Sequence, residues 1–573
     1  MAERAFVSGR NAAAAFGLRL HRGEGMVLLA MDWRRQRPPR DFVGFAIEVK
    51  APGAADFVAL KNRLSFSLDA RHLPDDRDTR QNPSILAPFQ AFRWMHMPQE
   101  NARQGEYRYR VTPLFMDAAG ALRTGAAQEA ATTLMHETVP GVLNIAFTRG
   151  YVSSQAFTDR FGGPAAIPTL LPRRAAEGLD FVATAPQAEE ALAWMGYEAR
   201  AAILKLLDEA IADSSAKVDV IAYDLNLPPL MDRFAALAGR LRIIIDDSGD
   251  HGEAHSAETE AAKRLVAMLG PANVIRQDVK GLQHNKMIIV RAATWAKAVG
   301  GSTNFSWRGF YVQSNNAVIV SGAAPVAIFA AAFEAYWAGR WPFASPGWQA
   351  LGLAGVDAQV TFSPRDGGAV LAALAEDVAA TKSSLFYSLA FISITPGAVQ
   401  DALAAVTDKA DRYVYGMSDK RLGLNLQRPG GNPVPVDSGG LGMTLPPPFR
   451  PEATGGGGVR LHHKFIVIDF DLPTARVYTG SYNVSRSADG KNGENFFCIR
   501  DRRVATAYMI EALRIFDHYH FRTKRAANRD SNTPMLLQKP PAAGEKAWFD
   551  RFWDDPVKVK DRTLFAGTGA ASV

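Results

Sequence analysis

The feature that most constrains the fold of this chain is an internal repeat. Residues 284–320 read HNKMIIVRAATWAKAVGGSTNFSWRGFYVQSNNAVIV, and residues 462–499 read HHKFIVIDFDLPTARVYTGSYNVSRSADGKNGENFFCI. Each copy opens with His-x-Lys before an apolar run, continues to Gly-Ser-x-Asn after a second run, and reaches a polar pair eleven residues later. The fold must therefore use one supersecondary unit twice.

Strands and helices alternate around both copies. AKVDVIAYDLN and LRIIIDDS precede the first copy, SSLFYSLAFI and RYVYGMSD precede the second, and each copy is followed by a stretch with one apolar helical face. This alternation is typical of an α/β fold. We therefore expect two pseudo-symmetric α/β lobes, at residues 146–360 and 361–530, each with a sheet covered by helices.

The first 145 residues have a different pattern. FAIEVK (45–50) and YRYRVT (107–112) alternate apolar with polar residues, which predicts half-buried antiparallel strands. Together with the turns between them, they predict a small all-β sandwich at 1–145, loosely similar to a fibronectin type III domain. Residues 531–573 form a C-terminal extension, and we expect its aromatic side chains to pack back on the body.

Composition narrows the class of protein further. The 573 residues carry a net charge of +7, which suits an anionic substrate without requiring nucleic acid. A single cysteine, Cys498, excludes a disulfide framework and a thiolate metal cluster. Arg10 and Arg19 interrupt the apolar residues near the N-terminus, so we expect no secretory signal and a cytoplasmic location.

The repeated residues can form a phosphate site. Strand alternation places His284 with Lys286 on one face, and His462 with Lys464 likewise, while Asn285 and His463 are expected to point away. The Gly-Ser-x-Asn turns add small polar groups. These are Ser302 and Asn304 in the first copy, and Ser481 and Asn483 in the second. Two such sets facing each other would surround an anion with cations and neutral donors.

This residue set also permits chemistry at phosphorus. One neutral imidazole can attack while the other donates a proton to the leaving oxygen, and the lysines hold the remaining oxygens, so no metal is required. A lone His-x-Lys is more often a surface pair. Here, however, Asn304 follows His284 by 20 residues and Asn483 follows His462 by 21, which makes coincidence improbable.

The two copies resemble the H-x-K-x4-D and G-S-x-N signatures of the phospholipase D superfamily. The resemblance covers roughly residues 190–525. It implies that both histidines meet at one active site and that catalysis runs through a covalent phosphohistidine without a cofactor. It also implies catalytic roles for Lys286, Lys464, Asn304 and Asn483, and substrate-binding roles for Ser302 and Ser481.

The first copy departs from the family pattern. The aspartate of the signature is present as Asp469, where it is expected to support local structure, but Arg291 occupies its place in the first copy. The two copies also differ at the residues expected to orient the imidazoles, which are Glu494 and Asn315.

This second difference leads to an assignment of roles. We expect the catalytic Glu494 beside His462, favouring an imidazolium that acts as acid and then base, and the substrate-binding Asn315 beside His284, favouring a neutral nucleophile. The reverse assignment of the two histidines stays open.

The resulting prediction is a phosphodiesterase that cleaves a phosphodiester or transfers its phosphoryl group to an alcohol. A phospholipid is the expected substrate, with possible peripheral membrane contact, because segments such as LGMTLPPPF are apolar. The alternatives are a nuclease or DNA-end phosphodiesterase, which would need a basic groove with stacking aromatic residues, and a phosphate-binding module without turnover. Because one chain supplies both copies, a monomer is permitted.

Overall fold

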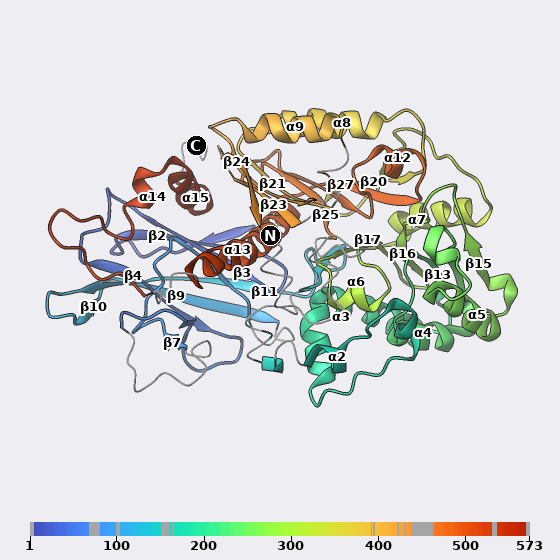
Figure 1. The fold of residues 1–573 in the computed structure, drawn as a ribbon, viewed down its shortest axis with the longest axis horizontal. Coiled ribbons are helices and arrows are strands. Elements are labelled where there is room, and N and C mark those ends of the chain that lie inside the picture. The colour runs from blue at the N-terminus through green and yellow to red at the C-terminus, as the bar shows by residue number, and fades with distance from the viewer. Residues whose placement is uncertain are drawn as a thin grey trace. The chain divides into compact units, whose positions relative to one another are not determined.

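The computed structural model describes residues 5–67, 81–98, 104–150, 157, 160–162, 166–390, 392, 396–420, 423–428, 431–436, 462–529 and 536–568. The apolar segment LGMTLPPPF lies outside these residues. The chain divides into two compact units, Met1–His136 with Phe521–Val573, and Glu137–His520. Figure 1 labels many of the elements of both. In the described part of the chain, no helix combines the length and the apolar character needed to span a membrane.

The first unit contains two antiparallel sheets. The first has the order β1-β2-β3-β8 and the second β10-β9-β4-β5, with β11 also paired to β9. The strands are β1 (Phe6–Ser8), β2 (Phe16–Arg22), β3 (Val27–Trp33), β4 (Phe42–Lys50), β5 (Val58–Ala59), β8 (Arg93–His96), β9 (Gly105–Met116), β10 (Leu122–Thr124) and β11 (Gln128–Leu134), with a separate pair β6 (Lys61–Asn62) and β7 (Asn82–Pro83). The N-terminal region is therefore all-β, as predicted.

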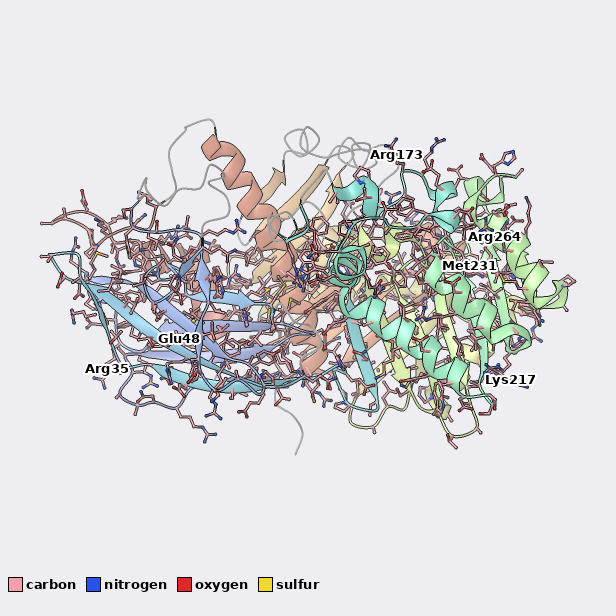
Figure 2. The ribbon with its side chains drawn as sticks, turned by 90° about the horizontal axis from the view of Figure 1, so that it is seen from below. Arg35, Glu48, Arg173, Lys217, Met231 and Arg264 are labelled. Atoms are coloured by element: carbon pink, nitrogen blue, oxygen red, sulfur yellow. The ribbon has the colours of Figure 1, made fainter. Side chains whose placement is uncertain are left out.

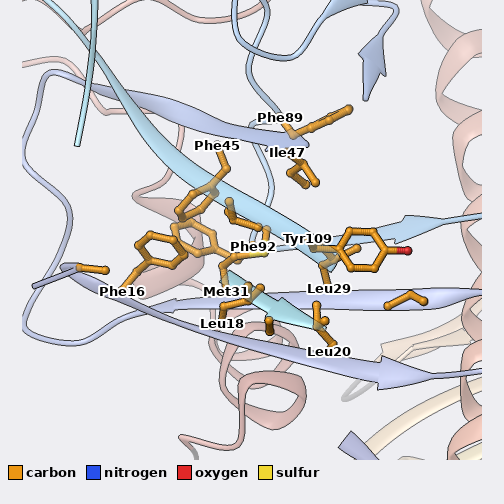
Figure 3. Close-up of a cluster of buried hydrophobic side chains, with 14 of the residues drawn as sticks. Phe16, Leu18, Leu20, Leu29, Met31, Phe45, Ile47, Phe89, Phe92 and Tyr109 are labelled. Atoms are coloured by element: carbon orange, nitrogen blue, oxygen red, sulfur yellow. The ribbon is translucent and has the colours of Figure 1, made fainter. Parts of the chain in front are cut away.

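Residues from both sheets share one apolar core (Figure 3). Along β9, Tyr107, Tyr109 and Val111 are buried while the residues between them are more exposed, so the alternation in the sequence sets the inward face. Trp548 and Phe549 belong to the same core, and the Trp548 indole donates a hydrogen bond to the carbonyl of residue 42 at 3.1 Å. The C-terminal segment, with α14 (Arg551–Asp554) and α15 (Pro556–Ala566), thus packs within this unit.

The second unit begins with a seven-stranded sheet in the order β12-β18-β17-β16-β13-β14-β15. Its strands are β12 (Leu143–Phe147), β13 (Lys217–Ala222), β14 (Leu241–Asp246), β15 (Val274–Gln277), β16 (Lys286–Arg291), β17 (Ala296–Gly301) and β18 (Asn316–Ser321). The helices are α2 (Ile167–Leu170), α3 (Ala188–Ala212), α4 (Pro228–Leu237), α5 (Ala257–Leu269), α6 (Trp307–Tyr311) and α7 (Ala323–Trp337). Figure 2 shows Lys217, the exposed first residue of β13, at the surface of this lobe. The boundary expected after residue 145 falls inside β12.

The second lobe has a nine-stranded sheet in the order β19-β20-β27-β26-β25-β21-β22-β23-β24. Its strands are β19 (Gln349–Ala350), β20 (Asp357–Ser363), β21 (Ser384–Leu389), β22 (Tyr413–Lys420), β23 (Gly423–Arg428), β24 (Gly431–Val436), β25 (Lys464–Ile468), β26 (Arg476–Gly480) and β27 (Glu494–Arg500). The helices are α8 (Ala369–Ala379), α9 (Ala398–Thr407), α12 (Arg486–Gly490) and α13 (Arg502–Arg529). The two lobes confirm the predicted α/β class.

Helices cover both faces of this second sheet, which explains the unbroken apolar run of β25. Ile466 and Ile468 share a core with helices α8 and α9, which lie along one side of the sheet (Figure 1). Phe465 instead faces Tyr508 of α13, with ring centroids 5.1 Å apart. Every residue of β25 is buried. The strand therefore lies at the centre of the lobe, and the residues before it are held in one place.

Hydrogen bonds join the two lobes where their repeated strands begin. The Asn495 side chain accepts from the backbone N–H of Gly301 at 3.0 Å, and the Asn316 side chain donates to Thr479 at 3.0 Å. The backbone N–H of His462 donates to the carbonyl of Ser314 at 3.2 Å. These contacts bring the two His-x-Lys segments to the same place.

Candidate active site

The two repeated histidines meet in one buried site. His284 lies two residues before Lys286, where β16 begins, and His462 lies two residues before Lys464, where β25 begins. The imidazole centroids of His284 and His462 are 6.3 Å apart, and the two residues are 4% and 6% exposed. Both rings can therefore contact one phosphoryl group.

A carboxylate orients the first imidazole. Nδ1 of His284 lies 3.0 and 2.9 Å from the two carboxylate oxygens of Glu494, the fully buried first residue of β27. Oε2 of Glu494 also accepts a hydrogen bond from Ser481 at 2.6 Å. Nδ1 is thus the nitrogen that carries the proton, and Nε2 is left for chemistry.

An amide orients the second imidazole. Nδ1 of His462 lies 2.8 Å from Oδ1 of Asn315 and 3.1 Å from the carbonyl of Ser302. The Asn315 amide is itself fixed, since its Nδ2 donates to the carbonyl of Gly309 and its Oδ1 accepts from Ser302 Oγ. Both partners of Nδ1 are acceptors, so His462 also presents Nε2 to the site.

These pairings correct the sequence prediction. Glu494 was expected beside His462 and Asn315 beside His284, but each residue contacts the histidine of the opposite lobe. The reason lies in the packing of the sheets. Both residues stand where β18 and β27 begin, at the junction of the lobes, so their side chains reach across it. An offset counted within one repeat cannot reveal this crossing.

The lysines of both copies are buried beside their histidines. The ammonium of Lys286 donates to the carbonyl of His284, and that of Lys464 donates to the carbonyl of His462 at 2.7 Å. Burial lowers the pKa of Lys286 to about 8, although Glu494 and Asp224 oppose this shift.

Burial also lowers the pKa of each imidazole. Glu494 opposes the shift at His284, whereas the charge of Lys464 adds to the shift at His462.

The small polar residues of the turns have two different placements. Ser302 and Ser481 contact the orienting residues, because their hydroxyls donate to Asn315 and Glu494. Their contacts therefore support the imidazole partners, which differs from the substrate-binding role expected for them. Asn304 is 3% exposed, and Oδ1 of both Asn304 and Asn483 is buried without a hydrogen-bond partner among the described residues.

Asp469 has a structural place at the far end of β25. Its Oδ1 accepts hydrogen bonds from the backbone N–H groups of residues 382–384, at 3.0, 2.7 and 3.2 Å, just before and at the start of β21. In the first lobe, Arg291 forms an ion pair with Asp219 instead.

The residues between each histidine and lysine have other partners. His463 contacts Glu511 at 3.0 Å, and the Asn285 side chain donates to Gln283 and accepts from Asn495, each at 3.0 Å.

Two residues near His284, Tyr223 and His251, were not predicted from the sequence. Tyr223 follows β13 directly, and its ring centroid lies 4.6 Å from that of His284 and 4.5 Å from that of His251. His251, in the short helix η5 (Gly249–Gly252), contacts Asp246 through Nδ1 at 2.8 Å. The available signal was the polar sequence YDLN placed immediately after a buried strand.

His251 also faces two further carboxylates. Ligand atoms of Asp224, His251 and Glu258 lie within 4.8 Å of one another, which is close enough to share a cation. Burial lowers the pKa of His251, but hydrogen bonds with Asp224 and Asp246 outweigh it and raise the pKa to about 10. The His251 imidazole is therefore protonated at neutral pH and can donate to both Asp224 and Asp246.

The chain was compared with known proteins. No curated protein matches its sequence. The fold has similarity to phosphatidylserine synthase from Haemophilus influenzae, with 12% identity, a TM-score of 0.39, and coverage of 69% of this chain and 97% of that one. The fold also has similarity to Nuc from Salmonella typhimurium, described as a phospholipase D family member. This match has 20% identity, a TM-score of 0.18, and coverage of 28% of this chain and 95% of that one.

A third solved structure with a similar fold is polyphosphate kinase from Porphyromonas gingivalis, with 10% identity and a TM-score of 0.35. The match covers 52% of this chain and spans 42% of the kinase.

A family model also matches part of the chain. Residues 207–337 fit the family described as "Cardiolipin synthase, PLD-like domain". This range contains the complete first copy, from His284 to Asn315. Residues 207–337 are therefore a phospholipase D-like domain.

Proposed function

We propose that the protein is a phosphodiesterase that cleaves phospholipids through a phosphohistidine intermediate. The observation that carries this proposal is the convergence of two buried imidazoles, 6.3 Å apart, each with Nδ1 held by a residue of the opposite lobe. Because both rings come from one chain, the site needs no second subunit.

In the first step, Nε2 of His284 attacks phosphorus and forms a P–N bond while the P–O bond to the leaving group breaks. His462 donates its Nε2 proton to the leaving oxygen, which departs as an alcohol. Burial keeps His462 largely neutral in the free protein, and a bound phosphodiester anion raises its pKa by supplying a nearby opposite charge.

In the second step, His462 accepts a proton from water as the water oxygen attacks phosphorus. The P–N bond breaks and His284 regains its lone pair. If an alcohol takes the place of water, the same step transfers the phosphoryl group. We assign Lys286 and Lys464, whose ammonium groups lie beside the two histidines, to hold the charged phosphoryl oxygens throughout.

The crossed contacts favour His284 as the nucleophile, for a reason other than the one expected from the sequence. An attacking imidazole gains positive charge as the P–N bond forms, and the Glu494 carboxylate at Nδ1 offsets that charge. The neutral Asn315 amide leaves His462 less basic, which favours release of its proton.

The substrate class is tested with three kinds of phosphodiester: a small aryl diester, phospholipids and DNA. The family description, a cardiolipin synthase, supports a lipid. We expect the purified protein to hydrolyse bis-p-nitrophenyl phosphate and lipids in phosphatidylcholine and cardiolipin vesicles, and to leave single-stranded DNA intact. The His284→Ala, His462→Ala double variant is the blank. Cleavage of DNA without cleavage of lipid would assign a nuclease instead, and equal hydrolysis by the blank would contradict the mechanism.

The alkaline limit of activity follows from Lys286. Since burial lowers its pKa to about 8, its ammonium is present below that pH and is lost as the pH rises through it. We expect kcat/KM for bis-p-nitrophenyl phosphate, which reports the free enzyme, to fall above pH about 8. In Lys286→Arg the guanidinium stays charged, so this fall should move to higher pH. An unchanged profile in that variant would exclude Lys286 as its cause.

A further inference from the structure

Strand register shows that the two lobes differ beside their catalytic histidines. Ala222 of β13 lies opposite Lys286 of β16, and Leu389 of β21 lies opposite Lys464 of β25. Ala222 and Leu389 therefore occupy equivalent places, and so do the residues that follow them. These are Tyr223 in the first lobe and Ala390 in the second.

Tyr223 contacts both functional groups of the first copy. Its ring meets the His284 imidazole edge to face at 68°, with centroids 4.6 Å apart. The ammonium of Lys286 lies 4.4 Å from the centre of the same ring, within cation–π distance. Ala390 has no ring to offer His462 or Lys464.

The Tyr223 ring also packs against His251. The two ring centroids lie 4.5 Å apart, and Asp246 fixes His251 through Nδ1. The other oxygen of Asp246 accepts from the backbone N–H of Gln283, the residue before His284, at 2.6 Å. His251, which packs on Tyr223, is thus connected through Asp246 to the segment that carries the His284 imidazole.

We infer that Tyr223 is a positioning residue that fixes the plane of the His284 ring and the place of the Lys286 ammonium, and so selects His284 for phosphorylation. This inference rests on the proposed function. The bond from Glu494 restrains Nδ1 but permits the ring to tilt about that contact. The edge contact with Tyr223 removes this freedom. His462 lacks such a contact from the equivalent residue, which suits a ring that only exchanges a proton.

Three variants test the inference with bis-p-nitrophenyl phosphate. Tyr223→Ala gives the first lobe the alanine that the second lobe has at the equivalent position. We expect kcat to fall about 100-fold and KM to change less than about threefold, because the variant misplaces the reacting His284 ring. Tyr223→Phe keeps the ring and should retain kcat within about threefold. Tyr413→Ala is the control, since Tyr413 is 2% exposed and pairs with Ser384, at the opposite end of β21 from Leu389.

A second readout separates positioning from a loss of stability. In a His462→Ala background, Tyr223→Ala should slow formation of the acid-labile phosphoprotein by a similar factor. Equal losses of kcat in Tyr223→Ala and Tyr413→Ala, or in Tyr223→Ala and Tyr223→Phe, would overturn the inference. An active wild type with an unaffected Tyr223→Ala overturns it as well and leaves the proposed function intact. A wild type without phosphodiesterase activity overturns the proposed function itself.

Discussion

Replacing either His284 or His462 by alanine is expected to lower kcat for phosphodiester hydrolysis by about 10⁴-fold or more, because removal of one member of a catalytic pair removes most of its effect. The loss should be non-additive, since both rings act in the same two steps. We therefore expect kcat of the double variant to be at most about tenfold lower than kcat of the less active single variant. Initial rates with bis-p-nitrophenyl phosphate measure this directly.

The same variants identify the attacking ring. A good leaving group such as p-nitrophenolate departs without an acid, so His462→Ala should still form the P–N bond and then accumulate the intermediate. We expect a phosphoprotein that is labile in acid and stable in base from His462→Ala, and none from His284→Ala. The opposite pattern would assign the attack to His462. Absence of a phosphoprotein in both variants, with wild type active, would contradict covalent catalysis.

The second large effect concerns Glu494. Glu494→Gln keeps the shape and a hydrogen bond to Nδ1 but removes the negative charge. We expect kcat to fall about 10³- to 10⁴-fold, approaching the roughly 10⁴-fold loss seen when a carboxylate that orients a catalytic histidine is replaced by its amide. The fall should appear in the rate of phosphoprotein formation, because the charge offsets the imidazolium character that develops during attack.

Asn315→Ala provides the matched comparison from the other lobe. It removes one of the two acceptors at Nδ1 of His462 without changing charge, and we expect kcat to fall by about 10- to 100-fold, typical of a residue that orients a functional histidine. Thermal unfolding of both variants controls for stability, since both positions are fully buried. A larger loss of kcat in Asn315→Ala than in Glu494→Gln would reverse the roles of the two histidines.

The repeat predicted the α/β class and the residues that meet at the site, because strand periodicity and spacing determine where side chains fall along a strand. The partners of the histidines could not be predicted in the same way. Glu494 is 210 positions from His284, and Asn315 is 147 positions from His462. Which residue faces which depends on how two sheets dock, and docking leaves no local periodicity in the sequence.

Tyr223 and His251 illustrate a second limit. Tyr223 directly follows β13, and His251 lies in the short helix η5 after β14. In such segments apolar alternation has ended and many polar sequences are compatible with the backbone. Their relation to His284 arises from the parallel order of β13 and β14 beside β16, which brings the ends of these strands to one edge. Asp246, the last residue of β14, connects these segments to the first copy, because it contacts both His251 and the backbone N–H of Gln283.

In the proposed mechanism, the crossed contacts make catalysis a property of the docked pair and of neither lobe alone. A shift between the sheets of little more than an ångström would break the bonds at both Nδ1 atoms, since hydrogen bonds weaken steeply beyond about 3.5 Å. Hydrolysis would then stop while each sheet kept its own core. Loss of activity in mild denaturant, ahead of any loss of secondary structure, would therefore be a sensitive measure of lobe separation.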